Sequence, residues 1–414
     1  MECMFLNKAI QKRVAACLVG AGVVLGTPVQ LAIAQPANPV MHPAAKVVNP
    51  NAKNLGIQVT ANDAMPNLMA RSAILIEAKT GNILYERNKD ARRFPASTTK
   101  IMTLIVALEK GNLDDMVTVG PNAVGVEGSS LYLEKGDKMP LRELLTGMMM
   151  QSGNDATVAV AEHIAGSVPA FAKMMTDKAR EIGAVGTNFV NAHGLPDDNH
   201  YTTAHDLARI TAYGYSLPEF ESIVSVQDAD YNWLRDPSKH ITSENKLLWQ
   251  YQGGNGVKTG YTERAGRCVV SAAKRDGVQL IAVVLDDPVM WTDAYAMLDY
   301  GFAHTRPSSF CKAGEEVTKI KVADAHIDEM ALVAARDSVI GTLYDENPKL
   351  EKKIEVPDKI SAPVKKGDVV GKAICYVDGM VVDRVDLLAS QDAPYHTFWS
   401  DLTTWFTKLM KGLF

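Results

Sequence analysis

From residue 67 onward, apolar positions recur with spacings typical of strands and then of helices. The segment "SAILIEAKTGNILYER" has two apolar runs around a polar stretch from Glu77 to Gly81, which predicts a β-hairpin. The segment "FPASTTKIMTLIVALEKG" has apolar residues at helical spacing, a proline suited to a first helical turn, and Gly111 as a stop. A hairpin followed by a helix therefore opens the first folded region.

The rest of this region mixes the same two patterns. The segment "LRELLTGMMMQSGNDATVAVAEHIAG" predicts two helices with a break at Ser152-Gly153. Residues 256–287 contain strand-like runs around a "KRDG" turn, and "WTDAYAMLDYGFAH" predicts a closing helix. Strands, a block of helices and strands again predict one α+β domain over residues 67–306.

The pattern changes in the last quarter of the chain. Short strand-like runs with Gly and Asp turns predict a small all-β domain over residues 308–393. Over residues 396–414, apolar residues recur at steps of three and four, with polar residues mostly opposite, which is typical of an amphipathic helix. Its charges disfavour a bilayer span, so we expect this helix to lie in a membrane surface. A helix docked on the β domain is the alternative.

The N-terminus has the pattern of an export signal. Cationic residues, the last of them Arg13, precede an apolar run over residues 14–31, and small residues end the run before Gln35. This predicts a signal peptide over residues 1–34, and the Pro-, Asn- and Ala-rich residues 35–66 predict a flexible linker. A retained transmembrane anchor is the alternative, but glycines and polar residues dilute the run. We expect an exported, periplasmic or extracytoplasmic protein attached to the outer face of the cytoplasmic membrane.

Composition and charge narrow the protein class. A chain of 414 residues with 47% apolar and 22% charged residues suits two globular domains with cores of their own. The net charge of −5, without a basic block, argues against nucleic acid as a partner. Past the signal, Cys268, Cys311 and Cys375 are too few, and odd in number, for a disulfide framework. Packing must therefore supply the stability.

Three short motifs carry candidate chemistry, and each occurs more than once. Ser-x-x-Lys on a helix puts a hydroxyl and an amine on adjacent turns of one face, where a neutral lysine can accept the serine proton. Copies of this motif begin at Ser97, Ser243, Ser271 and Ser309. Copies of Ser-x-Asn begin at Ser152 and Ser243, and copies of Lys-Thr-Gly at Lys79 and Lys258.

The order of the motifs selects among these copies. Penicillin-recognising serine enzymes place Ser-x-x-Lys, Ser-x-Asn and Lys-Thr-Gly in that chain order. Only the copy at Ser97 precedes both other motifs and opens a clear helix, and Ser152 lies in a break between helices. Ser243 is too close to the strand of Lys258 to form a separate wall, and Lys79 lies in the hairpin turn. Alone, Ser97 would be interpreted as a helix N-cap; the ordered set favours a nucleophile.

Four segments resemble a known family: "FPASTTKIMT", "SSLYLEKGDKMPLRELLTGMMMQSGNDA", "NAHGLPDDNHYTTAHDLARI" and "GVKTGYTERAGRCVVSAA". The chain is similar to the D-alanyl-D-alanine carboxypeptidases among the low-molecular-mass penicillin-binding proteins, from about residue 67 to its end. The resemblance implies an α+β, penicillin-recognising serine transpeptidase/β-lactamase-like domain, followed by a small all-β domain and a C-terminal amphipathic helix. It implies removal of the terminal D-alanine from peptidoglycan pentapeptides ending in D-Ala-D-Ala through an acyl-enzyme, with β-lactams as inhibitors and no cofactor.

The same resemblance implies roles for the motif residues. Ser97 would be the nucleophile and Lys100 its base, kept neutral by burial and by the charge of Lys258. Ser152 and Lys258 would relay a proton to the leaving D-alanine, and Asn154 would hold a substrate amide.

The Lys-Thr-Gly strand would bind the other end of the substrate. Lys258 and Thr259 would bind the terminal carboxylate, with Gly260 beside them. Backbone N–H groups of Ser97 and Tyr261 would form the oxyanion hole.

Other interpretations remain to be weighed against this one. His193, His200 and His205 suggest a zinc cluster, but their spacing matches no helical two-histidine motif, and we expect no metal. Cys268 is expected to be a buried apolar thiol. A β-lactamase is a rival enzyme, although the chain has no Glu-x-x-Leu-Asn to place a deacylating glutamate. A catalytically silent wall-binding protein is a second rival, disfavoured by the intact motif residues.

Overall fold

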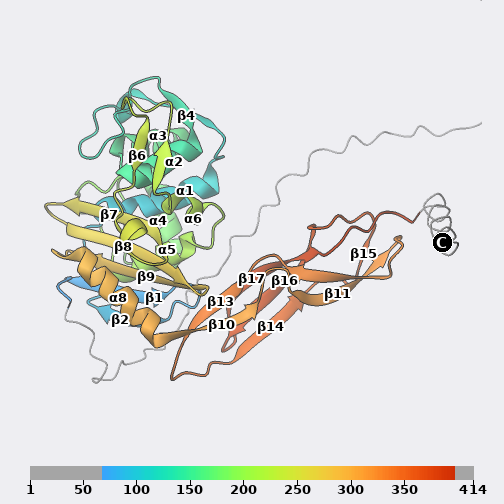
Figure 1. Cartoon of the computed structure of the whole chain (residues 1–414). Helices are drawn as coiled ribbons and strands as arrows, with labels where there is room; N and C mark the ends of the chain where they lie inside the picture. Colours follow the sequence, from blue (N-terminus) through green and yellow to red (C-terminus); the bar gives the residue numbers. More distant parts are fainter. Residues whose placement is uncertain (1–67, 397–414) are drawn as a thin grey trace, which may run out of the picture. The chain divides into compact units, whose positions relative to one another are not determined.

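A computed structural model describes residues 68–396, which form an α+β region followed by a β-rich region (Figure 1). The α+β region is built on a five-stranded antiparallel sheet with the strand order β2-β1-β9-β8-β7. Its strands are β1 (Ser72–Glu77), β2 (Ile83–Arg87), β7 (Gly254–Thr262), β8 (Gly266–Arg275) and β9 (Val278–Leu285). The predicted signal peptide, linker and terminal helix lie outside the described residues, except for residue 396.

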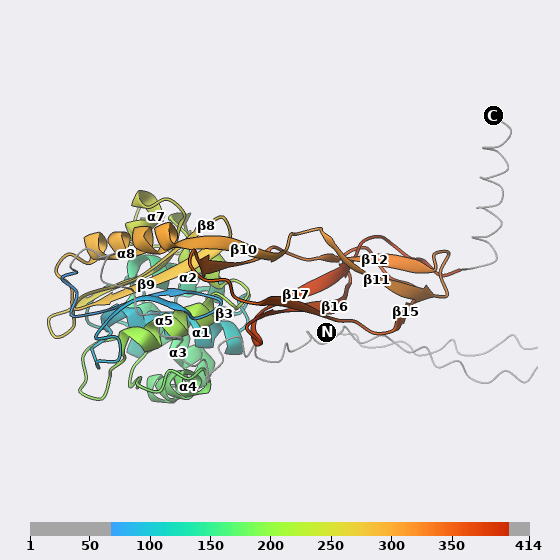
Figure 2. The ribbon, with the colours of Figure 1, turned by 90° about the horizontal axis from the view of Figure 1, so that it is seen from below.

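Both faces of this sheet are covered, because apolar residues point both ways along its central strands. In β1, Ile74 and Ile76 pack into one hydrophobic cluster, while Ala73 and Leu75 pack into another. Figure 2 shows α8 (Met290–His304) on one side of the sheet and α1 (Lys100–Lys110) and α5 (Ala204–Gly214) on the other. Strand β9 is buried along its whole length, as expected for a central strand covered on both faces.

A helical block on the α1 side carries the segment that was predicted as helix, break, helix. Helix α2 ends at Gln151 and α3 begins at Asn154, which confirms the predicted break. The helices of this block are α2 (Leu141–Gln151), α3 (Asn154–Ala165), α4 (Val168–Glu181) and α6 (Phe220–Val224). The short helix α7 (Leu247–Gln250) lies on the α8 side instead, where Leu247 packs into the cluster that contains Leu298 of α8. Two small hairpins join it, β3 (Met116–Thr118) with β4 (Lys138–Pro140), and β5 (Asp228–Asp230) with β6 (His240–Thr242).

The β-rich region begins at Thr305, directly after α8, and confirms the predicted all-β fold. A six-stranded sheet has the order β14-β16-β17-β12-β11-β15, and β10 pairs with β13. The strands are β10 (Thr305–Cys311), β11 (Glu316–Ala323), β12 (Glu329–Ala334), β13 (Ser338–Leu343), β14 (Leu350–Glu355), β15 (Lys359–Ser361), β16 (Val369–Val377) and β17 (Met380–Ala389). Its core is separate from that of the α+β region, and its two cysteines are free and buried.

The first Lys-Thr-Gly copy forms the turn between β1 and β2, as predicted. Gly81 has φ +71°, a conformation that glycine adopts without strain. The buried carboxylate of Glu77 accepts hydrogen bonds from the Lys79 and Thr80 backbone N–H groups and from the Thr80 hydroxyl. It also accepts one from the Gly341 N–H of β13, at 3.3 Å. Burial raises the pKa of Glu77, and these donors oppose that effect.

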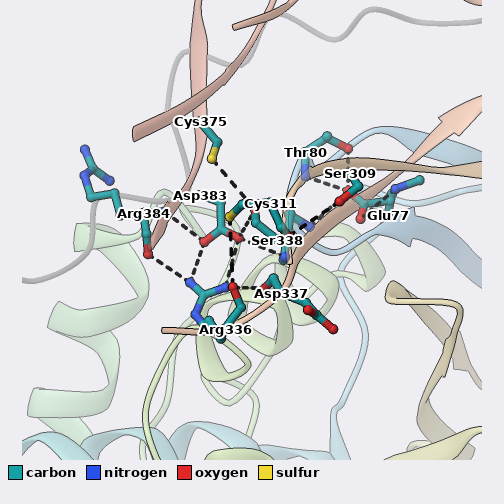
Figure 3. Close-up of polar contacts among 12 residues, drawn as sticks. Glu77, Thr80, Ser309, Cys311, Arg336, Asp337, Ser338, Cys375, Asp383 and Arg384 are labelled. Atoms are coloured by element: carbon teal, nitrogen blue, oxygen red, sulfur yellow. Dashed lines mark hydrogen bonds and ion pairs between the residues drawn. The ribbon is translucent and has the colours of Figure 1, made fainter. Parts of the chain in front are cut away.

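The same turn contacts the β-rich region through a buried carboxylate (Figure 3). Lys79 Nζ lies 2.9 Å from an oxygen of Asp383, which also accepts hydrogen bonds from Arg336 and from the Ser338 hydroxyl. Burial raises the pKa of the Asp383 carboxyl, but the hydrogen bonds from Arg336 and the charge of Lys79 outweigh this effect and hold the pKa below its usual range. This Lys-Thr-Gly copy thus has a structural role, joining a hairpin turn to β13 and β17.

Candidate active site

Ser97 lies in a short 3₁₀ helix, η1 (Ala96–Thr99), that leads into α1. The α-helix itself begins at Lys100, two residues later than a helix with an N-cap at Ser97 would, and the N-caps of η1 and α1 are Pro95 and Thr99. Because residues three apart share one helical face, the Lys100 amine comes within 3.0 Å of Ser97 Oγ. The catalytic interpretation of this Ser-x-x-Lys copy therefore agrees with the geometry, whereas the N-cap interpretation does not.

Lys100 is completely buried, and three oxygen atoms surround its amine. Besides Ser97 Oγ, Nζ lies 2.6 Å from Asn154 Oδ1 and 2.9 Å from the His193 carbonyl oxygen. Burial holds the pKa of the Lys100 amine well below its usual range, and the charge of Lys258 lowers it further. Glu244 and Asp155 act in the opposite direction. The site therefore favours a neutral amine beside the serine hydroxyl.

The break between α2 and α3 forms one wall of the site. Ser152 has the left-handed backbone conformation, with φ +61°, which is uncommon for a residue with a Cβ. Its hydroxyl is buried, and no group among residues 68–396 forms a hydrogen bond with it. A strained, buried and unpaired hydroxyl is typical of a functional position.

Both ends of the Asn154 side-chain amide contact the protein. Its Oδ1 accepts a hydrogen bond from Lys100, and its Nδ2 donates one to the Glu127 carbonyl at 2.6 Å. In this state its side chain orients the Lys100 amine, a contact that the sequence does not reveal because the two residues are 54 positions apart. The role of the following residue, Asp155, was also not predicted from the sequence. Its side chain is buried and accepts hydrogen bonds from the backbone N–H groups of Leu131 and Leu133.

Strand β7 forms the opposite wall and carries the second Lys-Thr-Gly at the edge of the sheet. A Cβ on Gly260 would lie 2.8 Å from the Ser97 backbone nitrogen, so only glycine lets the strand approach η1 this closely. Tyr261 follows with 63% of its surface exposed, and Thr259 is half-buried. The backbone of this strand therefore lies directly against the nucleophile, as an oxyanion hole requires.

Lys258 points into the protein and is almost fully buried. Its Nζ donates a hydrogen bond to the Thr259 carbonyl, at 3.1 Å. Burial lowers the pKa of Lys258 to about 8, with Glu244 opposing this effect. Lys258 can thus hold a proton near neutral pH while remaining able to give it up.

Glu244 lies near the site, although the motif order excluded the Ser-x-Asn copy that contains it. It lies inside the second Ser-x-Asn copy, and its backbone N–H donates to the Met150 carbonyl, two residues before Ser152. The charge of its carboxylate raises the pKa of both buried lysines, Lys100 and Lys258, against the lowering effect of burial. The second Ser-x-Asn copy therefore lies close to the site. Its closeness to Lys258 in the sequence is the signal that could have indicated this.

The histidines near the site have structural contacts. His193 supplies a backbone carbonyl to Lys100, and the His200 ring lies 2.9 Å from the Thr99 hydroxyl. His205 pairs with Asp90. Within residues 68–396, no group of three His, Cys, Asp or Glu residues is arranged to hold a metal ion. Cys268 is fully buried, as expected, and burial raises the pKa of its thiol to about 12.

Comparisons with known proteins agree with this geometry. Residues 58–289 match a family model described as D-alanyl-D-alanine carboxypeptidase, and residues 306–395 match the C-terminal domain of penicillin-binding protein 5. The first match covers more than half of the chain and includes all three motifs. The chain belongs to the D-alanyl-D-alanine carboxypeptidase family. It is thus a hydrolase of the penicillin-binding type, which confirms the enzyme class and fold class inferred from its motifs.

Individual relatives of this carboxypeptidase extend across both domains. The chain is 36% identical over 335 residues to D-alanyl-D-alanine carboxypeptidase DacF of Bacillus subtilis, covering 78% of this chain and 85% of that protein. It is 31% identical to DacA of Escherichia coli over 377 residues, covering 87% and 92%. The crystal structure of penicillin-binding protein 5 from Haemophilus influenzae matches with a TM-score of 0.57 and 32% identity, covering 80% of this chain and 99% of that one.

We predict that Gly260→Ala strongly impairs this carboxypeptidase without unfolding it. The added methyl group would press on the Ser97 backbone nitrogen, so η1 or β7 must shift. A displacement of about 1 Å at a reacting group lowers the rate by roughly 100-fold, and we expect a loss of that order in kcat/KM. The measurement is release of D-alanine from a D-Ala-D-Ala peptide.

Gly111→Ala is the matched control for this substitution. A Cβ there would also be crowded, 2.7 Å from a methyl group of Leu141, but at the far end of α1. We expect it to affect stability more than rate. Comparable kcat/KM values for the two variants would show that the close approach of β7 to η1 does not matter for catalysis.

Proposed function

We propose that Ser97, Lys100, Ser152 and the Lys-Thr-Gly strand remove the terminal D-alanine from peptidoglycan stem peptides. The observation that carries this assignment is the buried Lys100 amine 3.0 Å from Ser97 Oγ. A neutral amine has two N–H groups and one lone pair. Asn154 Oδ1 and the His193 carbonyl can only accept hydrogen bonds, so they take the two N–H groups. The lone pair is then left for the hydroxyl proton of Ser97.

Acylation follows from this arrangement. Lys100 takes the Ser97 proton while Oγ forms a bond to the carbonyl carbon between the two D-alanines. The developing oxyanion receives hydrogen bonds from the backbone N–H groups of Ser97 and Tyr261. Lys258 and Thr259 bind the terminal carboxylate through charge-assisted hydrogen bonds.

The C–N bond then breaks, and the leaving amine needs a proton. Ser152 supports that role, because its buried hydroxyl has no partner among the described residues and lies on the wall next to Asn154. The proton that Lys100 took from Ser97 passes to the amine by way of Ser152 and Lys258, which returns Lys100 to its neutral form. Water then attacks the Ser97 ester, with Lys100 again as base, and releases the shortened peptide. A β-lactam acylates the same serine.

We also propose that the enzyme works outside the cytoplasm, held at the membrane surface by its C-terminus. The supports are the signal-like sequence of residues 1–34, the Pro-, Asn- and Ala-rich composition of residues 35–66 and the amphipathic pattern of residues 396–414. Among residues 68–396, no helix has the length and apolar character needed to cross a bilayer.

We predict that Ser97→Ala abolishes both penicillin labelling and D-alanine release. Loss of the nucleophile lowers the rate by on the order of 10⁴-fold or more in serine enzymes with an assisting base. Intact-mass analysis after incubation with penicillin measures the labelling. Lys79→Ala, in the other Lys-Thr-Gly copy, serves as the control and should keep near-wild-type activity. A Ser97→Ala protein that is still acylated, at Ser243, Ser271 or Ser309, would refute the assignment.

We predict an alkaline decline of kcat/KM that reports Lys258. The ammonium form binds the substrate carboxylate, and this form exists below its pKa of about 8 in the free enzyme. Because kcat/KM reports ionisations of the free enzyme, it should fall as the pH rises through about 8. Lys258→Arg keeps its charge to much higher pH, so its decline should move upward even if its maximum is lower. A Lys258→Arg profile with an unshifted decline would assign that titration to another group.

We predict that Trp405→Glu weakens binding to anionic vesicles far more than Thr404→Glu. The helical spacing puts Trp405 on the apolar face, where a buried aromatic side chain contributes roughly 1.5 to 3 kcal/mol of transfer free energy. Deletion of residues 396–414 should release an enzyme that still cleaves a small peptide. Equal effects of the two substitutions, or loss of catalysis on deletion, would instead favour a helix docked on the protein.

A further inference from the structure

The loop over residues 188–202 packs against the start of α1, next to the nucleophile. The backbone N–H groups of Asn188 and Tyr201 donate to each other's carbonyls and so close the loop at its base. Within the loop, two backbone carbonyls accept hydrogen bonds from α1 side chains, those of Lys100 and Thr103. A closed loop with such contacts can hold the beginning of the helix in a fixed position.

His200 makes a third contact from this loop, through its side chain. Its Nε2 lies 2.9 Å from the hydroxyl oxygen of Thr99, and the ring is buried. On the other side of the ring, Nδ1 accepts the backbone N–H of Val190 at 3.2 Å. The ring also meets that of Phe189 edge to face, with the centroids 5.6 Å apart. Packing and hydrogen bonds at both nitrogens therefore fix its orientation.

These contacts decide which nitrogen of His200 carries the proton. Nδ1 faces the N–H of Val190, so it keeps its lone pair, and a neutral imidazole then has its hydrogen on Nε2. Burial lowers the pKa of His200 to about 4, although the charge of Asp197 acts in the opposite direction. The ring is therefore neutral near pH 7, and its Nε2–H donates a hydrogen bond to the Thr99 oxygen.

Thr99 is the last residue of η1 and the N-cap of α1, so it lies between Ser97 and Lys100. Its side chain makes no capping hydrogen bond and is completely buried. The backbone of the loop lies close to it, because a Cβ on Gly194 would come within 2.9 Å of the Thr99 hydroxyl oxygen. A shift of Thr99 would therefore move the backbone that carries the serine hydroxyl and the lysine amine.

The other side-chain hydrogen bonds of η1 in the described part of the chain stay local. The Thr98 hydroxyl donates to the Pro95 carbonyl, and the Ser97 hydroxyl contacts Lys100. Within residues 68–396, Thr99 is thus the η1 side chain that bonds to a distant segment, with its partner 101 positions away. That partner can set the orientation of the 3₁₀ turn relative to the loop.

We propose that His200 is a positioning residue for acyl transfer, acting on Ser97 through Thr99. Its Nε2–H hydrogen bond holds η1 in the orientation that puts Ser97 Oγ 3.0 Å from the Lys100 amine. The inference rests on the proposed function, in which Ser97 is the nucleophile. In this role His200 transfers no proton to or from the substrate. Its loss should slow formation of the acyl-enzyme, since the nucleophile would no longer be held against its base.

Substitutions at both ends of this hydrogen bond test the proposal. His200→Leu removes the donor, and Thr99→Val removes the acceptor with little change in shape. We expect each to lower both kcat/KM for a D-Ala-D-Ala peptide and the rate of penicillin acylation by about tenfold, because a small displacement of a reacting group is costly. His200→Gln should restore most of the rate, since its amide can donate to Thr99 and accept from Val190. Thermal unfolding of each variant shows whether it is folded.

The double variant with His200→Leu and Thr99→Val separates positioning from packing. If the hydrogen bond is what matters, the double variant should be no slower than either single variant, because the same interaction is lost only once. Independent packing effects would multiply to about 100-fold, and that result would overturn the proposal. A wild-type rate in folded Thr99→Val would also overturn it, even if His200→Leu failed to fold.

His205→Leu is the matched control, because it makes the same substitution in α5, shortly after the loop, at a histidine that pairs with Asp90. It should leave both rates unchanged. An active wild-type enzyme with a fully active His200→Leu variant would overturn only the positioning role. A wild-type enzyme that releases no D-alanine from the peptide would instead overturn the proposed function, so the two failures are distinguishable.

Discussion

The burial of one amine governs the rest of this site. Lys100 has no exposed surface, and a charged ammonium group in that position would lose its hydration without gaining a carboxylate partner among its three oxygen neighbours. Its neighbours are a hydroxyl, an amide oxygen and a backbone carbonyl. The nearby charge of Lys258 adds to the cost of protonation. These conditions favour the neutral form, which is the form that can activate a serine.

Excluding water from the Lys100 amine requires the surrounding backbone to pack very closely. Two glycines permit this close packing against η1. Gly260 brings β7 against the Ser97 nitrogen, and a Cβ on Gly194 would overlap the Ala96 carbonyl, 1.8 Å away. Gly194 also has φ +95°, and Ala96 itself has φ +47°. The serine is therefore held between β7 and the loop that supplies the His193 carbonyl. The positions of the sheet, of η1 with α1 and of that loop thus depend on one another.

The sequence predicted the parts of this arrangement that depend on local pattern. The β1–β2 hairpin, the helix after Ser97 and the break at Ser152 all follow from periodicity and turn residues, and the motif order identified the chemistry. Contacts between residues far apart in the chain were not predictable. Nothing local indicates that Asn154 orients Lys100 or that Asp155 holds the Ser130–Tyr132 loop. Likewise, Lys79 was recognised as a turn residue, but its pairing with Asp383 depends on a strand 304 positions away.

The same limit applies to Asn154, for which the motif predicts a substrate amide to bind. Its Oδ1 also accepts a hydrogen bond from Lys100 and its Nδ2 donates one to the Glu127 carbonyl, while each end keeps capacity for a further hydrogen bond. Ser152, beside it, retains a buried hydroxyl with no partner among residues 68–396. In the proposed mechanism, Asn154 therefore orients the base and Ser152 serves the reacting amine.

The most direct test of this account is the protonation state of Lys100 itself. NMR of the enzyme with ¹⁵N-labelled lysine, with Lys100→Arg used to assign the signal, would follow the Nζ resonance through a pH titration. An Nζ resonance that becomes that of a neutral amine well below the ordinary lysine pKa of about 10.4 is the result expected from its burial and from the charge of Lys258. An ammonium signal that persists to about pH 10 would contradict the account, because a protonated Lys100 has no lone pair with which to activate Ser97.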